Sequence, residues 1–122
     1  MNMQAAELKS LRTVGNSTSA GVTGSWVDMQ GFVTGRNFKA IFAAGPGTTA
    51  GTCGGSIQSA SDTAGTGATT RLTFSGLTAS GGYEEGHFTM ANHRALRFLG
   101  SVQTNKDMDL GCAVVGEALY RP

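Results

Sequence analysis

The sequence predicts a single all-β domain, a small β-sandwich or barrel of about seven strands. Its 122 residues include 19 glycines and only 14% charged residues, a composition that suits short strands and tight turns better than long helices. Several short segments alternate between apolar and polar side chains, which indicates strands with one buried face. Glycine-rich or polar turns separate these segments. A jelly roll and an immunoglobulin-like sandwich both fit this strand count.

The N-terminal segment is expected to lie outside the sandwich. Apolar residues recur at every third position from Ala5 to Leu11. Met3–Leu11 is therefore either a short helix or an extended arm, because a helix of this length is marginal without tertiary support. We divide the chain into an N-terminal arm and linker over residues 1–22 and a sandwich domain over residues 23–122.

The first clear strand is expected in Gly24–Phe32, GSWVDMQGF, which contains the only tryptophan. In an extended chain Val27 and Met29 point to one side, and Trp26 and Asp28 point to the other. We expect the first pair inside the sandwich. Trp26 then lies on the outer face, where a large aromatic side chain is useful at a contact with another subunit.

The remaining strands are expected wherever the same alternation recurs. Strand segments are predicted in FKAIFAA, SIQSASD, TRLTFSGL, HFTMA, HRALRFLGSVQT and LGCAVVGEALY. The buried face in three of them is expected to consist of Phe38, Ala40 and Phe42, of Leu72 and Phe74, and of Leu96, Phe98 and Val102.

Composition and charge exclude several classes of protein. The net charge of +1 gives no basic surface for nucleic acid, and no apolar run is long enough to span a bilayer. The N-terminus lacks the apolar region of a signal peptide, so synthesis in the cytoplasm is expected. Cys53 and Cys112 are too few for a disulfide framework or a cysteine-rich zinc site, and both are expected as reduced, partly buried thiols.

Three patterns raise the question of chemistry, and none is specific. YEEGHFTMANH contains Glu84, Glu85, His87 and His93, but zinc sites more often show three or four ligands with partners that orient them. TCGGS places Cys53 beside glycines, yet no third group is evident to orient a partner histidine. GPGTTAG and GTGATT lack the lysine of a phosphate-binding loop. We therefore expect no catalytic residue, no cofactor and no metal.

The order and texture of the strands resemble a group of small structural proteins encoded among the head and tail genes of tailed bacteriophages and prophages. The resemblance runs from about Gly24 to Pro122. The segments that carry it are GSWVDMQGF, AIFAAGPGTTAGT, SIQSASDTAGTG, HRALRFLGSV and GCAVVGEALYRP. CGGSIQSAS is richer in glycine and less charged than its counterparts, and the N-terminal segment lies outside the resemblance.

This resemblance implies a non-enzymatic virion component, most like a capsid decoration (cement) protein. Such a protein binds the major capsid protein on the outer surface of the capsid and stabilises the shell. The three-fold junctions of shells favour a homotrimer, and Met1–Ser19 is expected to order against the capsid protein. The candidate interface residues are Trp26, Phe32, Leu8, Leu11, Tyr83 and Tyr120.

Two other functions stay open. One is a neck, tail or spike component of the virion, present in a few to tens of copies where a cement protein is present in hundreds. The other is a carbohydrate-binding β-module for host attachment. That module requires an exposed aromatic platform, for which Trp26 and Tyr83 are the evident residues.

Overall fold

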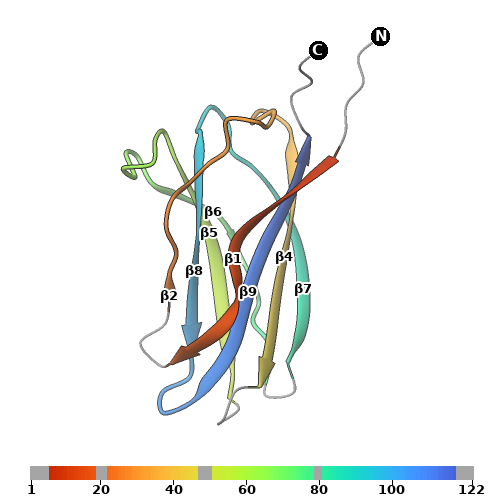
Figure 1. Ribbon diagram of the computed structural model, residues 1–122, viewed down its shortest axis with the longest axis vertical. Helices are drawn as coiled ribbons and strands as arrows, with labels where there is room; N and C mark the ends of the chain where they lie inside the picture. The colour runs from red at the N-terminus through yellow and green to blue at the C-terminus, as the bar shows by residue number, and fades with distance from the viewer. Residues whose placement is uncertain (1–5, 19–21, 47–50, 79–80, 118–122) are drawn as a thin grey trace.

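The computed structural model describes residues 6–18, 22–46, 51–78 and 81–117 and shows a sandwich of two antiparallel sheets (Figure 1). No helix occurs in these ranges. The strands, in chain order, are β1 (Ala6–Thr18), β2 (Val22–Thr23), β3 (Val27–Asp28), β4 (Asn37–Pro46), β5 (Cys53–Ala60), β6 (Thr69–Thr73), β7 (Gly82–Thr89), β8 (Ala95–Val102) and β9 (Asp107–Glu117). The all-β sandwich predicted from the sequence is confirmed.

The strand order identifies the topology as a jelly roll. One sheet has the order β1-β9-β4-β7; the other has the order β2-β8-β5-β6, with β3 also paired to β8. Because β2 and β3 follow one another along β8, they act as one interrupted strand. Among the strands of the described residues, only β5 and β6 are both consecutive in the chain and paired, whereas an immunoglobulin-like sandwich pairs several consecutive strands. The sequence left these two topologies open, and the strand order separates them.

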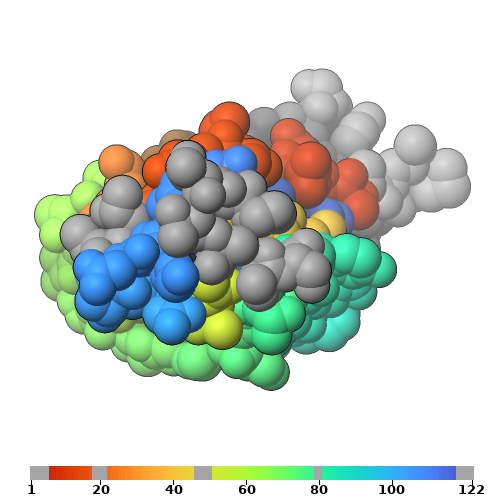
Figure 2. Space-filling model, turned by 90° about the horizontal axis from the view of Figure 1, so that it is seen from below, coloured from red at the N-terminus to blue at the C-terminus, as the bar shows by residue number. Residues whose placement is uncertain are grey.

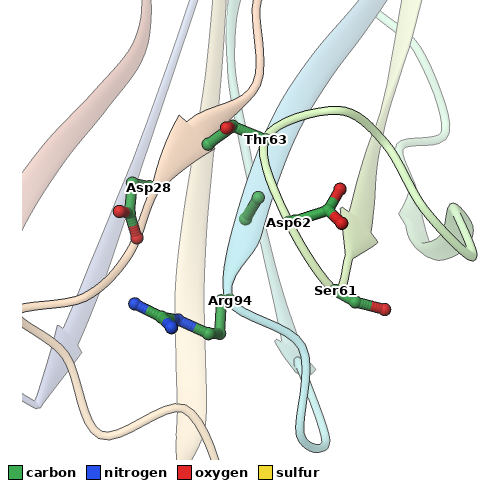
Figure 3. Close-up of a pocket in the computed structure, with 6 residues that line it drawn as sticks. Asp28, Ser61, Asp62, Thr63 and Arg94 are labelled. Carbon is green, nitrogen blue, oxygen red and sulfur yellow. The ribbon is translucent and has the colours of Figure 1, made fainter.

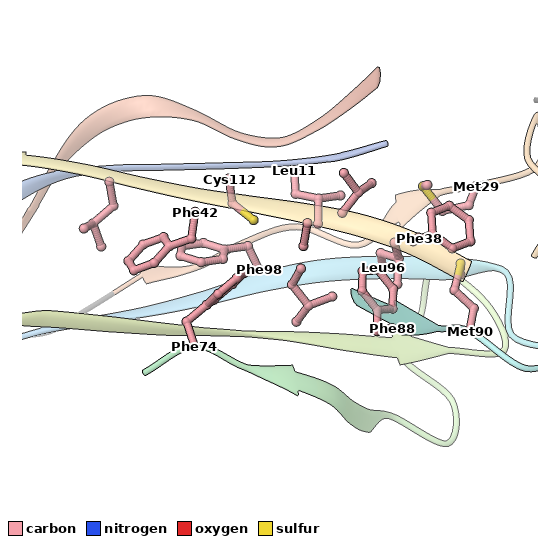
Figure 4. Close-up of a cluster of buried hydrophobic side chains, with 14 of the residues drawn as sticks. Leu11, Met29, Phe38, Phe42, Phe74, Phe88, Met90, Leu96, Phe98 and Cys112 are labelled. Atoms are coloured by element: carbon pink, nitrogen blue, oxygen red, sulfur yellow. The ribbon is translucent and has the colours of Figure 1, made fainter. Parts of the chain in front are cut away.

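The core lies between the sheets, where the predicted alternation is observed. Phe38, Ala40 and Phe42 of β4 are fully buried, and so are Leu96 and Phe98 of β8. The rings pack in groups across the interior (Figure 4): Phe38 stacks on Phe88 at 5.5 Å between centroids, and Phe42 lies 5.1 Å from Phe74 and 5.6 Å from Phe98.

The arm predicted at the N-terminus is a strand of the sandwich over its described part. β1 pairs with β9 along its length, from Ala6 opposite Glu117 to Thr18 opposite Asp107. Of the two alternatives for Met3–Leu11, the extended form is observed over residues 6–11 and the short helix is not. A boundary after residue 22 would separate β1 from its own sheet. Hydrogen bonds to a distant strand override a weak local helical pattern here. Register shifts near Ser10 and Arg12 explain why the spacing differs from two.

The stretch around Trp26 follows the prediction in orientation but not in length. Met29 is fully buried and Val27 packs against the core, whereas Asp28 is exposed and Trp26 is half-buried. Only Val27–Asp28 form a strand there, opposite Leu96 and Ala95 of β8. β3 lies within the predicted segment, so β1 and β2 account for the difference between the seven predicted strands and the nine observed.

Candidate functional site

The outer face of the sheet β1-β9-β4-β7 carries the large exposed hydrophobic side chains of the described residues. Three large hydrophobic side chains stand out among the described residues, namely Leu8 at 62% exposure, Val14 at 66% and Tyr83 at 69%. All three belong to this face, because Leu8 is opposite Val115, Tyr83 is opposite Ala43, and Val14 lies over Gly111. We call this surface, with its partly exposed members Ile41, Ala43, Ala113 and Val115, the apolar face.

The centre of the apolar face is recessed below its edges because the residues there have small side chains. A Cβ built on Gly111 would lie 2.6 Å from Cγ2 of Val14, so glycine is required there to let β1 and its valine cover β9. Beside this contact is a hollow of about 240 Å³, lined by Val14, Ala43, Ala44, Gly45 and Asp109. Val14 and Tyr83 come from the two edge strands of the sheet, β1 and β7, on either side of the centre.

Polar groups lie at two edges of the apolar face and are paired with one another. Lys39 Nζ lies 3.2 Å from a carboxylate oxygen of Glu85. Asn16 Nδ2 donates to Asp107 at 2.9 Å and more weakly to Asp109 at 3.5 Å. An apolar centre with a polar rim is the arrangement typical of protein–protein interfaces.

Trp26 lies on the opposite side of the molecule, on the outer face of the sheet β2-β8-β5-β6. The guanidinium of Arg97 stacks over its ring at 4.5 Å from the centroid and donates to Gln58 at 2.9 Å. Seen end-on in Figure 2, the red residues of β1 and the green residues of β6 lie on different sides of the molecule. Because Tyr83 pairs with Ala43 on β4 and Trp26 lies against Arg97 of β8, the two aromatic side chains belong to two separate surfaces.

The loop between β5 and β6 covers the edge of the Trp26 ring. It arches past β8, near Asp28 and Arg94 (Figure 3). A Cβ on Gly65 would lie 2.8 Å from the Trp26 Nε1 atom, and its φ of +88° is a conformation that L side chains rarely adopt. Glycine is therefore required at position 65 for two reasons, the backbone angle and the close approach of the loop to the ring.

Asp62 holds this loop together. Its Oδ1 atom accepts hydrogen bonds from the backbone N–H groups of Ala64 at 3.0 Å and Thr66 at 3.1 Å. Hydrogen bonds from the side chain and backbone of Thr66, with smaller contributions from Ala64 and Gly65, hold the pKa of Asp62 below its usual value. The ionised carboxylate is thus favoured in the folded loop, and this contribution is lost as the pH falls through the folded-state pKa.

We expect acid to loosen the contact between the loop and Trp26 before the fold is lost. Lowering the pH from about 5 to about 2 changes the Trp26 fluorescence while the far-UV circular dichroism is unchanged. Asp62→Ala shows altered emission already at pH 7 and no further change in this range. Asp109→Ala, on the opposite face, is the matched control and titrates like the unsubstituted chain. If Asp62→Ala and the unsubstituted chain gave the same profile, the interpretation of the loop would be wrong.

The four residues considered for a metal site do not converge. Glu84 accepts from the backbone of Ser75 at 2.6 Å and of Gly76 at 3.0 Å and so closes a turn, and Glu85 pairs with Lys39. The two histidines have separate partners: His87 contacts Asn37 at 3.2 Å, and His93 contacts Ser59 at 2.7 Å. Within the described ranges no group of three His, Cys, Asp or Glu side chains is placed to hold a metal ion.

The two cysteines are free and buried. Burial raises the pKa of the Cys112 thiol to about 12 and raises the pKa of Cys53 above its usual value, against a smaller opposite effect of a hydrogen bond with the Leu77 backbone. Both thiols are therefore protonated at neutral pH. This environment is the reverse of the one that activates a nucleophilic cysteine.

The structure divides the candidate interface residues into three groups. Leu8 and Tyr83 point outward on the apolar face, and Trp26 is half-buried on the other sheet. Leu11 and Phe32 are each only 6% exposed, so placing them at an interface was wrong, because they complete the core of their own chain. Tyr120 lies outside the described residues.

Sequence reasoning missed Val14, Ile41 and the small residues of the apolar face. The signal was present in β4, where Ile41 and Ala43 alternate with the buried phenylalanines and therefore point to the outer face of the sheet. Val14 gave no such signal, because the register shifts in β1 break the alternation before it.

Comparisons with known proteins agree with the fold described above. No protein-family model and no curated protein sequence matches the chain, and no helix in its described part has the length and apolarity to cross a membrane. The chain is similar in structure to the VP2 subviral particle of infectious bursal disease virus, with a TM-score of 0.54 and 10% identity over 94% of this chain and 32% of that one.

Two further structures share the fold. One contains the CBM22-1 and GH10 modules of Clostridium thermocellum xylanase 10B complexed with xylohexaose, with a TM-score of 0.52 and 9% identity over 96% of this chain and 26% of that one. The other is the N-terminal cellulose-binding domain of Cellulomonas fimi β-1,4-glucanase C, with a TM-score of 0.50 and 14% identity over 98% and 90%. The chain thus spans about a quarter to a third of the first two, and the likeness establishes a β-sandwich fold.

Proposed function

We propose that this chain is a non-enzymatic structural component of a virion, a decoration protein that binds the major capsid protein on the outer surface of the shell. The observation that carries the proposal is the apolar face, which gathers Leu8, Val14 and Tyr83 on one sheet. Single exposed apolar residues are ordinary on a protein surface, but a contiguous group with a polar rim marks a contact with another protein. The resemblance of the strand order and texture to small phage structural proteins supports the same function.

The absence of enzymatic activity is part of this proposal. Both thiols are buried with raised pKa values. Ser59 lies 2.7 Å from a histidine nitrogen but is fully buried, and Arg71 donates a hydrogen bond to its oxygen. A nucleophile requires access to substrate, which this buried serine lacks, so the serine–histidine pair serves the structure.

Copy number and reconstitution test the proposal. Mass spectrometry of purified virions is expected to find the chain in hundreds of copies, in fixed proportion to the major capsid protein. Purified chain added to shells that lack it is expected to bind them and raise the temperature at which they disrupt. A few to tens of copies per virion would instead assign it to a neck, tail or spike. Failure to bind shells would overturn the decoration role.

The carbohydrate-binding alternative loses the platform that it required. Trp26 and Tyr83 lie on opposite sheets, and the Trp26 ring is covered by Arg97 and by the loop at Gly65. A titration of Trp26 fluorescence with soluble oligosaccharides is expected to show no saturable change. Saturable quenching would favour the carbohydrate-binding module over the decoration protein.

A further inference from the structure

We propose that the apolar face binds a second copy of this chain in a two-fold dimer, in which Tyr83 of each copy packs into the hollow beside Val14 of the other. The inference deepens the proposed function, on which it rests, by assigning the apolar face to a contact between copies of this chain, which leaves the contact with the major capsid protein to another surface. The argument uses the shape of the face, its chemistry and its area.

Tyr83 has the properties of an anchor residue. It is the most exposed of the large apolar side chains described, at 69%, and none of the side-chain hydrogen bonds among the described residues involves its hydroxyl. Its neighbour across the strand pair is Ala43, which is too small to cover the ring. Tyrosine is enriched at the centre of interfaces, because one end of its ring is apolar and the other donates a hydrogen bond.

The hollow on the same face fits such an anchor. Its volume of about 240 Å³ is enough for a phenol ring, and its walls are Val14, Ala43, Ala44 and Gly45. Asp109 lies at its polar end and, from the described part of the chain, accepts a long hydrogen bond of 3.5 Å from Asn16. The carboxylate can therefore accept a hydrogen bond from the hydroxyl of an inserted tyrosine, which gives the pair a complementary polar end.

The positions of anchor and hollow on one face favour two-fold symmetry. Tyr83 is on the edge strand β7 and Val14 is on the opposite edge strand β1, and both align with the same pair, Ala43 opposite Gly111. A two-fold axis parallel to the strands and within the interface sets β7 of one copy against β1 of the other at the same level. Each Tyr83 then meets the partner's Val14, which is the reciprocal contact of an isologous dimer.

The area of the apolar face predicts a weak dimer. Four strands and the seven residues from Lys39 to Gly45 span roughly 19 by 23 Å, or about 440 Å² in projection. Stable complexes bury about 800 Å² on each partner. We therefore expect a dissociation constant on the order of 10–100 µM in solution, strengthened when many copies are held side by side on a shell. The dimer replaces the trimer that shell symmetry alone suggested.

Sedimentation equilibrium of the full chain between about 5 and 500 µM tests the dimer. The unsubstituted chain is expected to pass from monomer to dimer, and Tyr83→Ser to weaken association at least tenfold. Thr73→Ala, an exposed position on the other sheet, is the matched control and associates normally. A chain that is monomeric throughout, a trimer, or equal association of Tyr83→Ser and the control would each overturn the inference.

Chemical cross-linking tests the symmetry. Leu8 and His87 align with the same pair, Val115 opposite Lys39, so they are three strand spacings, about 14 Å, apart within one chain but face each other across the two-fold axis. Facing sheets lie about 10 Å apart, too far for a direct disulfide, so the test uses a bifunctional thiol reagent that spans about 6 Å. A double variant with Leu8→Cys and His87→Cys, which keeps Tyr83 and Val14, is expected to form a covalent dimer with this reagent and to stop there, because two-fold contacts close on themselves. A ladder of larger species would show a head-to-tail contact and overturn the two-fold arrangement, as would the absence of any cross-link.

The two proposals can fail separately. If the Tyr83→Ser chain is monomeric and still binds shells, the decoration role stands. Whether the dimer exists is then decided by the sedimentation experiment. If the unsubstituted chain dimerises through the apolar face but does not bind shells, the dimer stands and the proposed function is wrong.

Discussion

Replacing Phe42 by alanine is expected to lower the free energy of unfolding by about 3–5 kcal/mol. Phe42 is fully buried at the middle of β4 and packs on Phe74 and Phe98, so its ring contacts both sheets at once. Deleting it removes apolar surface from the core and leaves a cavity that the surrounding strands fill only in part. Because the free energy of unfolding of small domains is about 5–15 kcal/mol in total, the variant is expected to lose a large part of its stability.

Urea denaturation followed by Trp26 fluorescence measures this effect, at a protein concentration low enough to exclude self-association. Tyr83→Ala is the matched control: it removes an aromatic side chain from the next strand, but from the exposed face, and is expected to change stability by less than about 0.5 kcal/mol. Equal destabilisation by the two substitutions would show that the inward and outward faces of this sheet are assigned wrongly.

The faces of the central strands could be predicted from the sequence because they depend on a local rule. Side chains in a strand alternate between two sides, so the inward residues of β4 and β8 follow once Phe38 and Leu96 are recognised as buried. The same rule placed Met29 inside and Trp26 outside. It applies residue by residue and needs no knowledge of the neighbouring strand.

The pairing of β1 with β9 could not be predicted in this way. The residues of β1 have a weak helical spacing, and their partners lie about a hundred positions later in the chain. The strand exists because β9 offers a row of backbone hydrogen-bond partners, and its register shifts bury Leu11 while Leu8 and Val14 remain exposed. For that reason the apolar face became visible only in three dimensions, although Leu8 and Tyr83 had each been singled out.

Ser59→Ala is expected to lower the free energy of unfolding by about 2–3 kcal/mol, far more than a lost hydroxyl costs at a surface. Ser59 is fully buried on β5, and its hydroxyl contacts nitrogen atoms of both Arg71 and His93. Arg71 Nε donates to its oxygen at 2.7 Å, and the oxygen lies 2.7 Å from His93 Nδ1. Arg71 Nη2 lies only 3.4 Å from the same histidine nitrogen. Without the hydroxyl, a partly buried guanidinium and an imidazole both lose their short hydrogen bond and keep only this longer contact with each other.

The arrangement also determines how the protons are placed. Arg71 can only donate, so the Ser59 oxygen accepts from it and its own proton is free to point to His93 Nδ1. A serine can perform both roles at once, and alanine can perform neither. Ser56→Ala, on the half-buried outer side of the same strand, is the matched control and is expected to cost less than about 0.5 kcal/mol.

A double-mutant cycle with His93→Ala separates the network from simple packing. If the hydroxyl acts through the histidine, the two substitutions together cost clearly less than the sum of their single effects. Additive effects would show that Ser59 contributes only by filling space. In that case the contact between β5, β6 and the turn before β8 would depend on packing alone, and the two short hydrogen bonds would be incidental to its stability.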